Sequence, residues 1–186
     1  MNENEGGRYM EQNWMVLLQQ QNQLSKMMEV NRATERYGLS LSEQDAKMIL
    51  AERNQALQRE RRVEFGEGIA LQIIYEFCDS DFIEQDSYAD TIIRLQEIFY
   101  MYKNEMQDEI SDEELLHFMK EQFETVCFGD LDYLAGTCLA IFSQAIRAGY
   151  RGYRASEGRG EYGAFDEVER WDYDLYLEML KELCWR

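Results

Sequence analysis

Among the side chains that could carry out acid–base or nucleophilic chemistry in this sequence, histidine is the rarest. His117 is the only histidine among 186 residues. It follows Glu114 at the Glu-x-x-His spacing that carboxylate-bridged di-iron bundles use twice. Because no second histidine exists, this spacing does not predict a di-iron site. As a general base, His117 would need a cysteine or serine nucleophile within reach, and no spacing in the chain places one there.

The cysteines are Cys78, Cys127, Cys138 and Cys184. No two of them form a C-x-x-C pair, so the spacing typical of zinc sites and dithiol redox sites does not occur. The first residues are polar and acidic, which is not the pattern of a secretory signal peptide. We therefore expect a cytoplasmic protein whose cysteines are reduced thiols within its core.

Residues 103–115 resemble the second half of a calcium-binding EF-hand loop. Ser111 and Glu114 stand at its ninth and twelfth positions, but Lys103 occupies the first position and Asp108 replaces the turn glycine. Ser111 and Glu114 also form a capping box at the start of a helix, and we prefer that interpretation. No catalytic, cofactor-binding or metal-binding residue is predicted, and no cofactor is expected.

One segment differs from the rest of the chain in being basic and rich in glycine. Residues 148–163 hold five glycines and three tyrosines, a composition that predicts a loop. Gly158, Gly160 and Gly163 match G-x-G-x-x-G, but the dinucleotide motif follows a strand, and here a helix and an arginine-rich loop precede the glycines. The candidate partner-binding residues are Arg147, Tyr150, Arg151, Tyr153, Arg154 and Arg159.

The net charge decides which partner that segment would contact. The chain carries a charge of −18, and residues 63–146 account for 19 acidic against 3 basic side chains. Arginine and tyrosine together can stack on bases or bind phosphate, but such an acidic molecule repels nucleic acid. We therefore expect the arginines to contact carboxylates, either of the chain's own helices or of a protein partner. A basic partner would be attracted to the acidic region.

The elements that position these side chains are expected to be helices, since the chain has no proline and favours leucine, methionine, glutamate and glutamine. Residues 87–126 form the organising unit, a helical hairpin with Asp86 as the predicted N-cap of its first helix. Apolar stripes at helical spacing mark its two helices: Tyr88, Ile92, Leu95, Phe99 and Tyr102, then Leu115, Met119, Phe123 and Val126.

Residues 69–78 are apolar on most sides and predict a central, buried helix. Ser42 with Asp45 is a second capping box. Gly136 lies inside a helical pattern, which a close helix crossing would explain and chance would explain as well. The fold class is all-α, a compact bundle of about seven to eight helices. The expected organisation is a disordered segment over 1–7, a helical domain over 8–147, the loop over 148–163, and a C-terminal helix over 164–186 that packs on the domain or swaps from it.

Residues 39–150 resemble a family of uncharacterised proteins from Firmicutes genomes. The resemblance rests on the runs Leu41-Ser-Glu-Gln-Asp-Ala-Lys, Arg53-Asn54, Arg62-Val-Glu-Phe-Gly, Tyr75-Glu-Phe-Cys-Asp-Ser, Leu95-Gln-Glu-Ile-Phe-Tyr, Lys103-Asn-Glu, Ser111-Asp-Glu-Glu-Leu and Cys127-Phe-Gly-Asp-Leu. It implies a bacterial cytoplasmic protein and brings no activity, cofactor or catalytic residue with it.

The function that fits these observations best is a non-enzymatic, acidic helical module for protein–protein interaction or regulation. An alternative is an acidic decoy that mimics nucleic acid and inhibits a nucleic-acid-binding protein. A further alternative is an enzyme with a site built from carboxylates and arginines. No apolar run approaches the ~20 residues of a membrane span, so no membrane partner is expected.

Overall fold

A computed structural model describes residues 21–64 and 68–149, and every structural statement below concerns these ranges. Their regular structure is helical and includes no strand, which confirms the predicted all-α class. The expected number of seven to eight helices is not confirmed, because it counts segments outside the described ranges. The predictions for residues 1–7 and 164–186 also fall outside them.

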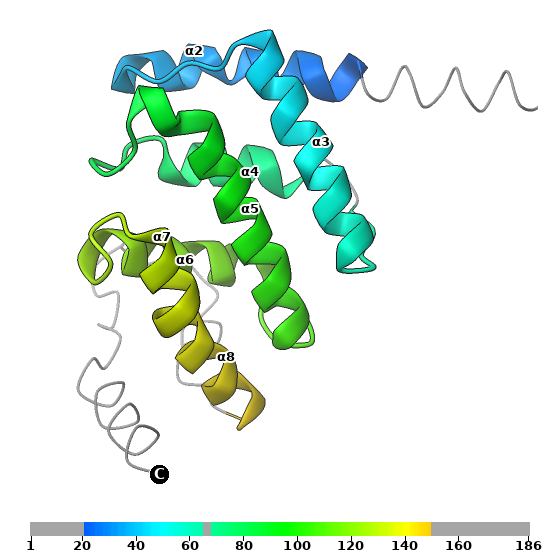
Figure 1. The fold of residues 1–186 in the computed structure, drawn as a ribbon, viewed down its shortest axis with the longest axis vertical. Helices are drawn as coiled ribbons and strands as arrows, with labels where there is room; N and C mark the ends of the chain where they lie inside the picture. The colour runs from blue at the N-terminus through cyan, green and yellow to red at the C-terminus, as the bar shows by residue number, and fades with distance from the viewer. Residues whose placement is uncertain (1–20, 65–67, 150–186) are drawn as a thin grey trace, which may run out of the picture.

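After a helical segment over 21–29, the helices are α2 (Asn31–Thr34), α3 (Glu43–Arg59), α4 (Ile69–Phe77), α5 (Tyr88–Glu105), α6 (Asp112–Thr125), α7 (Leu131–Tyr133) and α8 (Ala140–Arg147). In Figure 1, α3, α5 and α8 run in one diagonal direction, and α4 and α6 cross behind them. None of the described helices is long and apolar enough to cross a bilayer.

Helices α3 and α5 run parallel and make the largest helix–helix contact. At their starts, the Ser40 backbone N–H donates to the Gln85 side chain over 2.7 Å. At their ends, the Arg62 guanidinium donates to Asn104 over 2.9 Å. The chain between them includes α4, which contacts α3, α5 and α6 and so lies at the centre of the bundle.

The prediction of a central apolar helix is confirmed by α4. Its buried side chains are Ile69, Ala70, Leu71, Ile73, Ile74 and Phe77. Burying a large aliphatic side chain contributes about 1.5–3 kcal/mol, so this short helix supplies a large share of the core. The helix begins after Gly68, whose φ of +86° is one that side chains with a Cβ rarely adopt.

The two organising helices form as predicted, with one correction at the first N-terminus. Asp86 is not the N-cap of α5: it lies in a 3₁₀ turn over Gln85–Ser87, and Ser87 stands at the cap position without a side-chain hydrogen bond that caps the helix. The 3₁₀ turn precedes α5 directly, so Asp86 lies within helical backbone and not at the cap position. Both capping boxes are confirmed, Ser42 with Asp45 and Ser111 with Glu114.

A π-helix over Leu134–Leu139 lies between α7 and α8. Gly136, within this π-helix, is exposed and has no atom within 4 Å of the position of a Cβ. Of the two explanations for this glycine, the close helix crossing is therefore wrong.

Candidate functional site

A row of aromatic rings leads from the core to the surface beside the end of α6. Phe77 meets Phe123 edge to face at 5.6 Å between ring centroids, and both are buried. Phe82 continues the row at 6.2 Å from Phe123, and Phe128 lies 6.2 Å beyond Phe82. Phe82 is 40% exposed and Phe128 is 69% exposed. We call Phe82 and Phe128 the aromatic edge.

The backbone holds Phe128 in an uncommon conformation. Its φ is +49°, in the left-handed region that costs a residue with a Cβ roughly 1–2 kcal/mol. Gly129 follows with φ of +86°, and a Cβ there would lie only 2.8 Å from the Cβ of Phe82. The Gly129 N–H donates to the Phe123 carbonyl over 2.9 Å, which closes the end of α6. The turn therefore fixes Phe128 beside Phe82.

The loops that carry the aromatic edge are acidic. The carboxylates on these loops and the adjoining helix ends belong to Asp79, Asp81, Glu84, Glu124, Asp130 and Asp132. Lys120 pairs with Asp79 at 2.5 Å, and its hydrogen bond lowers the pKa of that carboxyl below the usual range. Arg94 reaches Asp132 at 3.4 Å. Because only Lys120 and Arg94 among the described residues pair with these six carboxylates, the surroundings of the aromatic edge keep a net negative charge.

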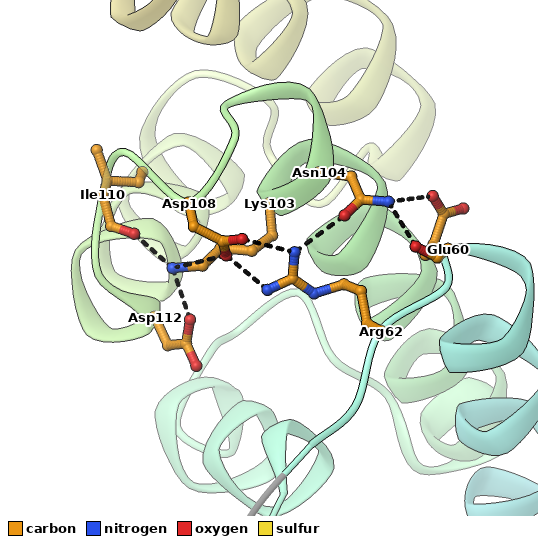
Figure 2. Close-up of polar contacts among 7 residues, drawn as sticks. All are labelled: Glu60, Arg62, Lys103, Asn104, Asp108, Ile110 and Asp112. Atoms are coloured by element: carbon orange, nitrogen blue, oxygen red, sulfur yellow. Dashed lines mark hydrogen bonds and ion pairs between the residues drawn. The ribbon is translucent and has the colours of Figure 1, made fainter.

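A cluster of polar side chains connects the end of α3 to the loop after α5 (Figure 2). The Arg62 guanidinium donates to Asp108 through two nitrogens, at 2.5 and 3.1 Å. Asn104 joins Arg62 to Glu60 by donating to the Glu60 backbone and side-chain oxygens, both at 2.9 Å. Gln107 and Asp108 both have positive φ, so these contacts hold a strained turn in place.

Lys103 completes this cluster from inside. Its side chain is 6% exposed, and its ammonium lies 2.7 Å from an Asp112 oxygen and donates to the Ile110 carbonyl. A buried ammonium is stable in this way only when carboxylate and carbonyl oxygens surround it. Because each charged group in the cluster already has partners, the arrangement is a structural clamp rather than a site with a free acid or base.

A buried ion pair fixes the entry to α4. Arg53 Nε and Glu64 Oε2 are 2.7 Å apart, without the alignment of a hydrogen bond. The other Glu64 oxygen accepts from the Ile69 N–H at 2.5 Å and from the Tyr100 hydroxyl at 2.7 Å. Burial and the Glu64 charge raise the pKa of Tyr100 well above its usual value. The carboxylate thus serves as a cap for α4, with each oxygen occupied.

The two best-formed hollows in the described ranges are smaller than an ordinary ligand site. The two best-formed hollows measure about 140 and 260 Å³, whereas small-molecule sites measure roughly 300–1,000 Å³. No three histidine, cysteine, aspartate or glutamate side chains of the described residues gather as a metal site would require. Phe82 and Phe128 belong to a larger set of exposed large apolar side chains of the described chain, which includes Tyr75 and Tyr133, and the rings of Phe82 and Phe128 contact each other.

The structure separates the residues that the sequence singled out. His117 is exposed, with Nδ1 at 3.9 Å from a Glu76 carboxylate oxygen. Glu114, its Glu-x-x-His partner, accepts from the Ser111 N–H and so is occupied in the capping box. Arg147 is exposed at the end of α8. The other candidate partner-binding residues, Tyr150, Arg151, Tyr153, Arg154 and Arg159, lie outside the described residues.

The predicted burial of the cysteines is confirmed for Cys78, Cys127 and Cys138. Cys184 lies outside the described residues. The sequence predicts that Phe82 and Ile83 fill the core from the loop, and this is correct for Ile83 and wrong for Phe82, which is 40% exposed. Nothing in the sequence indicates that Phe128 is exposed, because exposed phenylalanines carry no local pattern. The Phe128-Gly129 pair after a helical stripe was a usable clue, since a glycine often ends a helix.

The described chain is thus an all-helical protein with charged clusters that stabilise the fold and one exposed aromatic edge in acidic surroundings. Residues 26–152 match the model of DUF6323, a family of unknown function, and the chain belongs to that family. No curated protein and no solved structure matches the chain. The predicted resemblance to a family without known activity is confirmed, while its Firmicutes origin stays a prediction.

Proposed function

We propose that this chain is a non-enzymatic, acidic interaction module that binds or regulates another protein, and that the aromatic edge is its docking surface. The observation that carries the proposal is Phe128, a 69% exposed aromatic ring on a left-handed backbone. The free protein gains nothing from either property, since both cost free energy in water. Exposed, well-positioned aromatic rings are residues that dominate binding energy at protein interfaces.

The charge around the edge supports a particular kind of partner. The acidic side chains beside Phe82 and Phe128 outnumber Lys120 and Arg94, so the surface attracts a basic one. The partner would offer an apolar socket for the rings, bordered by lysine or arginine. The proposal places this encounter in the cytoplasm of a bacterium.

The proposal can be tested by comparing three forms of the full chain in affinity capture from a bacterial lysate. These are the wild type, Phe128→Gly, and Val63→Ala as the matched control, because Val63 is 75% exposed but lies on the connector after α3. We expect one partner that the wild type and Val63→Ala retain and Phe128→Gly loses. With purified partner, the loss should be about 2 kcal/mol, roughly thirtyfold in Kd.

The identity and salt dependence of the partner separate the remaining outcomes. Binding should weaken as salt rises, because the acidic surroundings contribute by long-range attraction. A nucleic-acid-binding protein as the captured partner would favour the decoy alternative over a regulatory module. If Phe128→Gly captures the same proteins with the same affinity as the wild type, the aromatic edge is not the docking surface.

A further inference from the structure

Two buried thiols lie in contact, and one of them belongs to Cys127, the residue before Phe128. The sulfur atoms of Cys127 and Cys138 are 3.6 Å apart, and the residues are separated by 11 positions in the chain. Cys127 is 6% exposed at the turn after α6, and Cys138 is 2% exposed within the π-helix. Cys78 is engaged elsewhere, since its thiol donates to the Tyr75 carbonyl over 3.4 Å.

We propose that Cys127 and Cys138 form a redox modification site, which closes to an intramolecular disulfide by exchange with a small-molecule disulfide such as oxidised glutathione. This inference is independent of the docking function. A disulfide has a sulfur–sulfur bond of about 2.05 Å, so the two sulfur atoms must approach by only about 1.5 Å. Cys127 lies in the turn after α6 and Cys138 lies in the π-helix. Both segments depart from regular α-helix, and we expect them to adjust locally.

The exchange proceeds in two balanced steps. The Cys127 thiolate, the more exposed of the two, attacks one sulfur of the small disulfide and releases one thiolate. The Cys138 thiolate then attacks the Cys127 sulfur of the mixed disulfide and releases the second thiolate. In total the protein loses two protons and two electrons, and the small disulfide is reduced to two thiols.

The rate of this exchange should depend on pH in a defined direction. Burial and the neighbouring Cys138 raise the pKa of Cys127 to about 12, and burial raises that of Cys138. The thiolate is the attacking species, so only a small fraction of either thiol reacts near neutral pH. We therefore expect slow exchange that accelerates about tenfold per pH unit until Cys127 begins to titrate.

The experiment uses the full chain with Cys78→Ser and Cys184→Ser, and the unaltered chain alongside it. Each is incubated with oxidised glutathione under native conditions, and circular dichroism verifies that the protein remains folded. Cleavage at Asp130 and Asp132 then separates the two cysteines unless a disulfide joins them. We expect linked peptides from both proteins, lost on reduction, with faster formation at higher pH.

Two further measurements make the outcome decisive. Cys138→Ser should yield no linked peptide and should stop at the mixed disulfide with glutathione on Cys127. Incubation with oxidised glutathione in urea measures how far the unfolded chain forms the same disulfide. Linkage that appears only in urea, or free thiols that persist in the folded chain throughout the incubation, would overturn the proposal. Pairing of Cys127 with Cys78 or Cys184 in the unaltered chain would overturn it as well.

Discussion

At the scale of single residues, the effect of Phe128→Gly on stability distinguishes a docking role of Phe128 from a structural one. Glycine adopts a φ of +49° freely, so Phe128→Gly relieves local strain while it removes a ring that is mostly in water. We expect the free energy of unfolding to change by less than about 1 kcal/mol in urea denaturation. A loss above about 2 kcal/mol would show that the ring holds the turn together.

The pair of Arg62 and Asp108 should make stability depend on pH. Hydrogen bonding to Arg62 lowers the pKa of the Asp108 carboxyl in the folded protein. The unfolded chain therefore binds a proton at a higher pH, and the pair's contribution is fully present above the ordinary aspartate value of about 3.9. This contribution is lost as the pH falls through the lowered folded value.

Asp108→Asn tests that direction, because asparagine keeps the shape of the carboxyl group and cannot ionise. We expect the wild type to be more stable than the variant at neutral pH, with the difference shrinking as the pH falls below about 4. Urea denaturation at a series of pH values measures it. Asp81→Asn, at an exposed loop carboxylate with no ion pair among the described residues, is the matched control. A difference that is constant with pH would contradict the argument.

At the scale of helices, the apolar stripe of α5 should account for much of the stability. Phe99 is 2% exposed in the middle of that stripe and meets Tyr100 edge to face at 5.6 Å. Phe99→Ala should cost about 3–5 kcal/mol in the free energy of unfolding, because it leaves a cavity in the core. Met101→Ala, on the exposed side of the same helix, should cost under about 1 kcal/mol. Equal effects would indicate that the stripe does not face the core.

The same scale shows which features of this fold were predictable. The two capping boxes and the stripe of α5 were found because each depends on residues within a few turns of one helix. The extra turn before α5 was missed, since Asp86 and Ser87 both suit a helix start and tertiary contacts decide between them. Phe128 was missed for a related reason: its ring contacts Phe82, which is distant in sequence.

At the scale of the whole molecule, the distribution of charge is the property that a partner would meet first. Four of the buried or half-buried cations of the described chain, Arg53, Arg62, Lys103 and Lys120, each pair with a carboxylate of the same fold. Residues 63–146 hold 19 acidic and 3 basic side chains, so a large acidic excess remains there to be balanced by salt ions or by a partner. The arginines of residues 147–163 are the cations that we expect to balance part of this acidic excess.

This charge balance leads to a prediction for Arg151, Arg154 and Arg159, which stays untested by the described residues. If these arginines contact carboxylates at the surface, each pair contributes only about 0–1 kcal/mol. Replacing all three by glutamine should then leave the melting temperature almost unchanged while weakening a protein partner that uses them. Thermal melting and salt-dependent binding to single-stranded RNA and DNA are the two measurements. Micromolar nucleic-acid binding that falls steeply with salt and vanishes in the triple variant would contradict the prediction and assign the segment to nucleic acid.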